Sequence, residues 1–218
     1  MTFAIPSSWT FEDSEVATDF DVHVREQLPW YDLATNAVAH VARHYIPTGG
    51  MVYDIGASTG NIGRALASTL EARSATLVGI EPAKEMAALY QAPGAVHVQS
   101  VVGYPFEECD LVVAFLSLMF VPPKNRSTVV SRVMESLRTG GAFVVFDKRE
   151  SLAGYVGTIL ARLTLAGKVA AGVSSERIIQ KELSLSGVQR PIDPSLFPSG
   201  SVEFFRFGEF SGWILEKR

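Results

Sequence analysis

Residues 54–60 of this chain, Asp-Ile-Gly-Ala-Ser-Thr-Gly, combine an acid, a serine and two glycines directly after a short apolar run. As Gly-x-Ser-x-Gly, the stretch matches the sharp turn that presents a serine nucleophile in many hydrolases, with Ser58 as the attacking group. Alternatively, the glycines let the backbone approach a nucleotide closely. A second acid, Glu81, ends the next apolar run, where it could bind a ribose. The motif therefore indicates either acyl transfer or nucleotide binding.

The order of the remaining residues argues against the serine nucleophile. A serine hydrolase of this kind needs an acid and then a histidine after the serine. The histidines lie at positions 23, 40, 44 and 97, and none lies beyond the middle of the chain. Ser58 is therefore not predicted to be a nucleophile, and nucleotide binding is the better interpretation.

Dinucleotide binding stays an alternative with weaker support. Gly56, Gly60 and Gly63 are spaced G-x-x-x-G-x-x-G, whereas the dinucleotide fingerprint is G-x-G-x-x-G. No tyrosine is followed four residues later by a lysine, the pair found in short-chain reductases, and no second domain is expected for a hydride acceptor. An NAD(P)-binding oxidoreductase is therefore the second hypothesis.

The elements that must position these residues alternate along the chain. The first twenty residues lack strong periodicity and predict a flexible or lid-like arm. Continuous apolar strands indicate a parallel sheet covered on both faces. We expect an α/β, Rossmann-like fold with a mostly parallel seven-stranded sheet, a C-terminal antiparallel hairpin and helices on both faces. The predicted helices span 33–45, 60–72, 82–90, 124–138 and 152–173 (one helix or two), and the predicted strands span 51–55, 75–80, 95–99, 110–116, 142–146, 202–207 and 210–215.

Composition narrows the class of protein. The 218 residues carry a net charge of −4 with no block of like charges, so a large basic face for nucleic acid is not expected. The single Cys109 excludes an internal disulfide and a cysteine-based zinc site, and we expect no metal. The N-terminus is polar and acidic, unlike a signal peptide, and the uncharged run 151–161 is too short to span a membrane. A cytoplasmic protein without membrane contact is the expectation.

The turn and its neighbours resemble a known superfamily. Asp54-x-Gly56-x-x-x-Gly60 followed by Glu81 resembles the first motifs of class I S-adenosylmethionine (SAM) dependent methyltransferases. Within that superfamily the chain looks like the carboxy-SAM synthase family, which supplies a modified SAM for tRNA wobble-uridine modification. The similarity covers most of residues 18–150 and the last dozen. Its matching segments are 20–24 (FDVHV), 28–31 (LPWY), 52–58 (VYDIGAS), 112–120 (VVAFLSLMF), 140–148 (GGAFVVFDK) and the terminal hairpin.

The resemblance implies SAM as the cofactor, with S-adenosylhomocysteine as the product, in a class I methyltransferase fold. It places Asp54 and Gly60 in the cofactor turn, and Phe115 and Ser100 where the family has an asparagine and an adenine-site acid. The other implied contacts are Tyr31 near the methionine end of SAM, Gly56, Ala57 and Ser58 along its chain, Glu81 and Pro82 at the ribose, and Val101 with Ser100 beside the adenine.

One departure decides which reaction we predict. The segment between Arg190 and the final hairpin is shorter than in the family, and the family's arginine for the extra carboxylate has no clear counterpart there. Arg190 itself is expected to face solvent. We therefore expect methyl transfer, with a carboxy-SAM synthase-like enzyme or a non-catalytic SAM-binding module as alternatives.

The acceptor and the catalytic residues stay open. The predicted partner is a small-molecule substrate or a tRNA nucleoside, with a homodimer as one option. The chain is expected to be a single SAM-binding domain, 1–218, in which 1–46 is an arm and helix and 150–200 lies on the substrate side. General-base candidates facing the strand ends are His23, Asp147, Lys148 and Glu150, none of which is assigned as catalytic.

Overall fold

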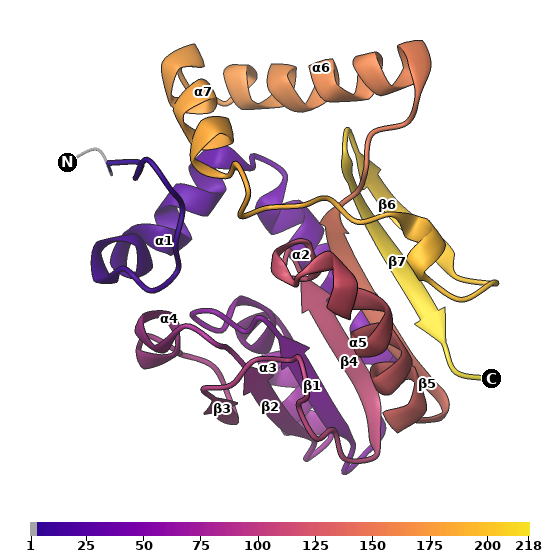
Figure 1. The fold of residues 1–218 in the computed structure, drawn as a ribbon. Helices are drawn as coiled ribbons and strands as arrows, with labels where there is room; N and C mark the ends of the chain where they lie inside the picture. Colours follow the sequence, from indigo (N-terminus) through magenta and orange to yellow (C-terminus); the bar gives the residue numbers. More distant parts are fainter. Residues whose placement is uncertain (1–3) are drawn as a thin grey trace.

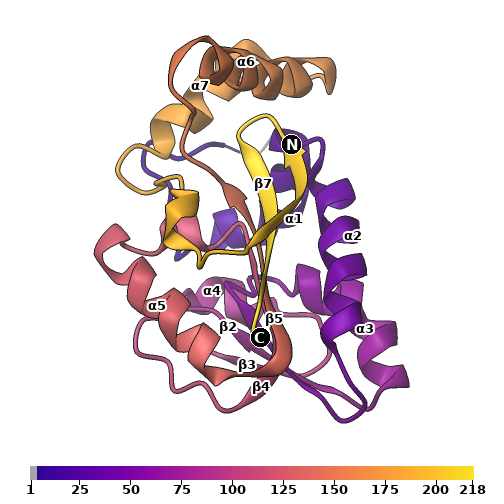
Figure 2. The same cartoon turned by 90° about the vertical axis from the view of Figure 1, so that its right-hand side faces the viewer.

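The computed structural model describes residues 4–218, which build a seven-stranded sheet with helices on both of its faces (Figures 1 and 2). The strand order is β3-β2-β1-β4-β5-β7-β6. β7 pairs antiparallel with both β5 and β6, while the pairs from β3 to β5 are parallel. This confirms the predicted fold class. The strands are β1 Met51–Ile55, β2 Thr76–Ile80, β3 Ala95–His97, β4 Cys109–Phe115, β5 Leu137–Lys148, β6 Val202–Phe207 and β7 Phe210–Glu216.

The helices divide between the two faces of the sheet and its carboxyl edge. Figure 2 shows α5 on one face and α2 with α3 on the other, while α6 and α7 lie beyond the strand ends. Short 3₁₀ turns cover 43–45, 118–120 and 194–196. The α-helices are α1 Ser14–Gln27, α2 Tyr31–Ala42, α3 Asn61–Ala72, α4 Lys84–Ala88, α5 Pro123–Ser136, α6 Gly154–Ala170 and α7 Ser175–Ser184.

The continuous apolar strands make the centre of the sheet. All seven residues of β4 are buried, because this strand has a neighbour on each side and helices above and below. The side chains of Val112 and Val129 belong to the core under α5, and those of Leu111 and Leu66 belong to the core under α2 and α3. Burial on both faces fixes the direction of each strand, and so fixes which residues end at the carboxyl edge.

One prediction from the sequence was wrong, and one helix was not predicted. The arm expected over the first twenty residues contains α1, which begins after Asp13, whose side chain accepts hydrogen bonds from the N–H groups of Glu15 and Val16. The sequence also gave no prediction of α7, although Ser174 is a good helix N-cap and accepts from the N–H of Arg177. Both missed helices lie against the functional site.

Candidate functional site

The order of the strands creates a crevice at the carboxyl end of β1. The chain runs outward from β1 to β2 and β3, then returns to place β4 on the other side of β1. Ligands of open α/β sheets bind at such a switch point. Here the turn after β1 has positive φ at Gly56, Ser58 and Gly60. A Cβ on Gly56 would lie 2.5 Å from the Cβ of Ser117 after β4, so only glycine fits there.

The turn is held by the end of β2. Two of its N–H groups donate to the carbonyl of Ile80, at 2.8 and 3.2 Å, and the N–H of Ser58 donates to Glu81 Oε2 at 2.9 Å. Asp54, at the end of β1, accepts none of these three hydrogen bonds, because the turn folds toward β2 and takes its acceptors there. Glu81 therefore shapes the turn as well as ending its strand.

Glu81 is positioned with both carboxylate oxygens already bonded once. Its Oε1 accepts from the N–H of Ala83 at 2.9 Å, opposite the bond from Ser58. Burial raises the pKa of Glu81, and these two backbone bonds oppose the rise. A carboxylate offers about four acceptor positions, so two stay open. Glu81 can thus accept a pair of hydroxyls without losing its own anchors.

Asp54 and its surroundings hold polar atoms that need a partner. Burial, together with the nearby charge of Glu81, raises the pKa of Asp54 to about 7. Within residues 4–218, Asp54 Oδ2, Ser58 Oγ and Ser117 Oγ are buried without a hydrogen-bond partner. Since buried polar atoms are normally paired, these three indicate a polar ligand.

A cavity of about 240 Å³ opens beside this edge. Gly60 is the one predicted cofactor residue that does not line it; instead it forms the N-cap of α3, close to Tyr90 and Ala92. The predicted cofactor residues that the structure brings together on the cavity wall are Tyr31, Asp54, Gly56, Ala57, Ser58, Glu81, Pro82, Ser100, Val101 and Phe115.

Aromatic rings form the wall at the end of β4. Phe115 stacks on Phe146 with ring centres 5.0 Å apart, and the Tyr31 ring meets Phe115 edge-on at 5.3 Å. The guanidinium of Arg25 lies over Tyr31, 5.0 Å from the ring centre. Burial raises the pKa of the Tyr31 hydroxyl, which therefore stays protonated. This wall can support an uncharged part of a ligand.

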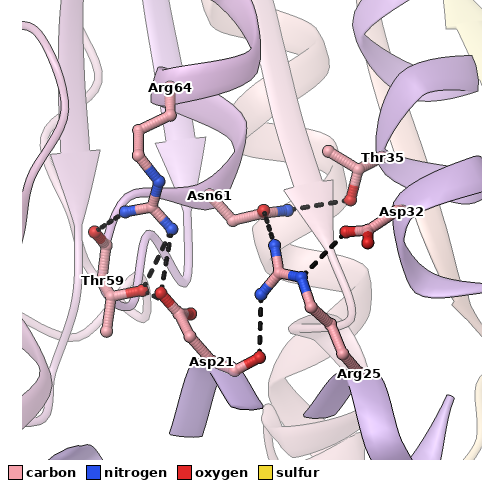
Figure 3. Close-up of polar contacts among 7 residues, drawn as sticks. All are labelled: Asp21, Arg25, Asp32, Thr35, Thr59, Asn61 and Arg64. Carbon is pink, nitrogen blue, oxygen red and sulfur yellow. Dashed lines mark hydrogen bonds and ion pairs between the residues drawn. The ribbon is translucent and has the colours of Figure 1, made fainter.

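Helix α1 is tied to the turn by a polar network (Figure 3). Asp21 accepts from Thr59 Oγ1 at 2.8 Å and from Arg64 at 3.1 Å, and Arg64 also donates to the carbonyl of Thr59. The three residues come from α1, the glycine-rich turn and α3. The network therefore places α1 against the residues that line the cavity.

A second set of contacts continues the network to α2 (Figure 3). Arg25 donates to Asp32 at 2.9 Å and contacts Asn61 Oδ1 at 3.5 Å. Asn61 in turn donates to Thr35 Oγ1 at 2.9 Å. The two arginines of the site thus position helices, and their charges are already paired with carboxylates.

The wall contributed by β5, α6 and α7 carries lysines that the sequence did not single out together. Lys168 and Lys148 both contact Glu182, at 3.0 and 3.6 Å, and Lys181 is the third lysine of this wall. Burial and the neighbouring Lys168 lower the pKa of Lys181 to about 6. Lys168 and Lys181 lie on the buried sides of α6 and α7, and a lysine at such a helix position was the sequence signal for this cluster.

The four general-base candidates differ in burial and in whether they line the cavity. His23 lines the cavity, and burial together with Lys181 lowers its pKa to about 3, so its ring is uncharged. Asp147 is fully buried and accepts from the N–H groups of Met119 and Lys148, at 3.2 and 2.9 Å. Glu150 is exposed and does not line the cavity. Of the four candidates, the cavity is lined by His23 and Lys148.

Arg190 does not face the cavity. It is exposed, as expected, and its backbone N–H donates to the carbonyl of Met119 at 2.9 Å. Its own carbonyl accepts from Arg126 at 2.6 Å. Only the preceding residue, Gln189, reaches the cavity wall. Arg190 is therefore a surface residue whose backbone hydrogen bonds attach the loop after α7 to Met119 and Arg126.

Comparisons with known proteins agree with this geometry. A family model described as a methyltransferase domain matches residues 52–141, the segment that contains the turn. A carboxy-S-adenosyl-L-methionine synthase of Shewanella amazonensis is 31% identical over 188 residues, which cover 82% of this chain and 77% of the relative. The chain belongs to the carboxy-SAM synthase family. This family belongs to the class I SAM-dependent methyltransferases, so the predicted superfamily and its cofactor, SAM, are confirmed.

Other members and solved structures extend the likeness. The carboxy-SAM synthase of Staphylococcus epidermidis is 27% identical over 192 residues, covering 86% of this chain and 84% of the relative. A SAM-dependent methyltransferase of Methanococcus maripaludis superimposes with a TM-score of 0.58 at 16% identity, covering 96% of this chain and 95% of that one. The plantazolicin methyltransferase BpumL, solved with S-adenosylhomocysteine, gives 0.60 at 10% identity, covering 94% and 90%. These two structures share the fold.

The described part of the chain contains no membrane-spanning helix and no cluster of metal ligands. None of its helices has the length and apolar character needed to cross a bilayer. Nor do residues 4–218 gather three or more histidine, cysteine, aspartate or glutamate side chains around a position for a metal ion.

Proposed function

We propose that this chain transfers the methyl group of SAM to a small-molecule acceptor bound in the same cavity. The observation that carries the proposal is the division of the cavity into two sides. The edge of the sheet offers buried polar atoms without partners, and the opposite wall is made by helices with apolar and lysine side chains. One side suits a polar cofactor, and the other leaves room for a second molecule.

The cofactor side fits SAM by its chemistry. Glu81 has two open acceptor positions for a ribose diol, and the unpartnered Ser58 and Ser117 hydroxyls suit an amino-acid end. Asp54, whose pKa is raised to about 7, would become a stable carboxylate beside the positive charges of the ligand. SAM supplies an already activated methyl group, so the chain has to orient the acceptor and exclude water.

The acceptor side favours a small molecule over a nucleic acid. Helices α1, α6 and α7, from residues 1–46 and 150–200 of the single proposed domain, lie over the strand ends (Figure 1). Trp9, His23 and Leu185 line the cavity there, so residues outside the sheet would contact the acceptor. The net charge of −4 gives no general attraction for a phosphate backbone. A tRNA nucleoside would have to reach the cavity past these helices without help from a basic surface.

A carboxy-SAM synthase-like activity is the second candidate, and one observation favours it. The wall made by β5, α6 and α7 brings three lysines to the cavity against one glutamate, Glu182. A buried ligand carboxylate needs a cation, and these lysines provide a counter-charge that Arg190, facing solvent, does not. The relatives that share the name carboxy-SAM synthase support the same candidate.

Mass spectrometry of the ligand released from the purified protein tests the two candidates. We expect SAM or S-adenosylhomocysteine after expression in a bacterial host, and [methyl-³H]SAM should transfer label to a small-molecule fraction. Glu81→Gln should purify without the ligand, while Glu85→Gln on α4, outside the cavity, should retain it. Recovery of carboxy-SAM that is lost on Lys181→Met would favour the second candidate. Recovery of NAD would contradict both.

A further inference from the structure

Lys181 occupies an unusual place on the cavity wall. It lies on the inner side of α7 with Ile178 and Ser184, and only 9% of its surface is exposed. Its ammonium nitrogen lies over the ring of Trp9, and the residue lines the cavity. A lysine usually extends its charged end into water. This one holds its amine against an indole ring at the cavity wall.

The charged groups around Lys181 give it no acid of its own. On α6 and β5, Lys168 and Lys148 share Glu182, the residue next to Lys181. On the outer part of α7, Arg177 pairs with Glu26 of α1 at 3.2 Å. Among the described residues no carboxylate lies within ion-pair distance of the Lys181 amine. His23 of α1, the remaining titratable group here, is uncharged because burial and the surrounding cations lower its pKa.

These surroundings favour the uncharged amine. Removing a lysine from water disfavours its ammonium form, and the positive Lys168 adds to that cost. Both effects lower the pKa of Lys181 to about 6, and Glu182 opposes them only in part. Lys168 and Lys148, by contrast, both have a carboxylate partner in Glu182. Near neutral pH the wall therefore holds one free amine lone pair.

We propose that Lys181 is the base on the acceptor side, which removes the proton from the acceptor's hydroxyl or amine as the methyl group is transferred. This inference rests on the proposed methyl transfer. The acceptor's O–H or N–H proton passes to Lys181 Nζ, and the acceptor's lone pair forms the new bond to the methyl carbon. The bond from that carbon to sulfur breaks, and its electron pair stays on sulfur. One positive charge disappears at sulfur, and one appears at Lys181.

The other titratable groups of the cavity do not fit this role. His23 is uncharged but too weak a base at neutral pH, because its pKa is about 3. Lys148 and Lys168 both form ion pairs with Glu182, and they lower the pKa of that carboxyl against the effect of its burial. Asp54 and Glu81 lie on the cofactor side of the cavity. Lys181 alone combines a free lone pair with a place on the acceptor wall.

The protonation state of Lys181 can be measured without any acceptor. The chain has six lysines, so ¹³Cε-lysine labelling gives a small set of NMR signals that Lys→Arg variants assign. In the full-length protein with S-adenosylhomocysteine bound, we expect the Lys181 signal to titrate near pH 6. The signal of the exposed Lys84, which lies outside the cavity, serves as the control. A Lys181 signal that stays charged at pH 8 would overturn the proposal, and would be expected if a ligand carboxylate paired with it.

A pair of probe nucleophiles tests the catalytic step. Phenol is protonated at neutral pH and needs a base, whereas thiophenol is largely ionised near pH 8 and does not. With SAM, we expect Lys181→Met to slow S-adenosylhomocysteine formation from phenol by about 100-fold or more and from thiophenol by less than about 3-fold. Wild-type rates with phenol should fall below about pH 6, where the amine is protonated. Lys181→Arg, which stays charged, should behave like Lys181→Met.

The outcomes distinguish a failure of the Lys181 base from a failure of the proposed methyl transfer. Equal loss with both probes, in variants that keep the wild-type circular dichroism and S-adenosylhomocysteine affinity, would make Lys181 a positioning residue and refute the base. No loss with phenol would refute it as well. Failure of the wild-type protein to methylate either probe or a small-molecule fraction would contradict the proposed function, while the NMR titration would still decide the state of Lys181.

Discussion

Glu81→Gln is the most informative single change at the cofactor side. Glu81 accepts one backbone N–H on each oxygen, from Ser58 and Ala83, and has two positions left for a ribose diol. Glutamine keeps the shape of the side chain but loses the negative charge and replaces one acceptor oxygen with a donor. It therefore weakens the ligand contacts and leaves one of the two backbone N–H groups facing an NH₂ group.

The size of the effect follows from these contacts. A hydrogen bond to a charged acceptor contributes about 1.5–3 kcal/mol, and one such contact to the ribose should be lost outright. This corresponds to a roughly 10- to 150-fold weaker dissociation constant for S-adenosylhomocysteine. The fold should also lose about 1–3 kcal/mol, since one buried N–H next to the turn loses its acceptor. Relief of the repulsion between Glu81 and Asp54 should offset part of that loss.

Isothermal titration calorimetry with S-adenosylhomocysteine measures the dissociation constant, and urea unfolding measures the free energy of unfolding. Glu85→Gln on α4 changes the same residue type outside the cavity and should leave both unchanged within error. An unaltered dissociation constant in a folded Glu81→Gln protein would show that the ribose does not bind at the end of β2. The cofactor would then have to use another part of the cavity.

Three further outcomes are expected. Asp54 has a pKa raised to about 7, above its unfolded value, so its contribution to stability is complete below about pH 4 and is lost as the pH rises to about 7. Asp54→Asn should flatten that part of the pH–stability curve, by up to about 1.4 kcal/mol per pH unit, in urea unfolding at several pH values. Gly56→Ala should cost about 1–3 kcal/mol or more in the same assay, because φ is +70° and the added Cβ meets Ser117. In thermal-shift assays, SAM and S-adenosylhomocysteine should raise the melting temperature while NAD and NADP should not; stabilisation by NAD alone would contradict the assigned cofactor.

The sheet and the cofactor turn could be predicted from the sequence because their signals are local. Continuous apolar runs mark buried parallel strands, and β1 and both strands of the hairpin lie within a residue of their predicted limits. Glycines at 56 and 60 mark positions of positive φ, which is a property of single residues. Acids that directly follow strands meet at one edge once the strands are parallel. The positions of Asp54 and Glu81 at this edge could therefore be predicted without knowing any contact between distant segments.

The acceptor side was decided by tertiary structure, because it joins segments far apart in the chain. Asp21 of α1 contacts Thr59 of the turn and Arg64 of α3. The sequence around each of these residues does not indicate which partner it contacts. Lys168 and Lys181 look like ordinary charged residues until α6 and α7 pack over the strand ends and bury them. A side chain's charge state depends on the partners and the solvent that surround it. The sequence alone therefore determined which acids and glycines meet at the carboxyl edge of the sheet, and only the folded arrangement decided that Lys181 would line the cavity outside an ion pair.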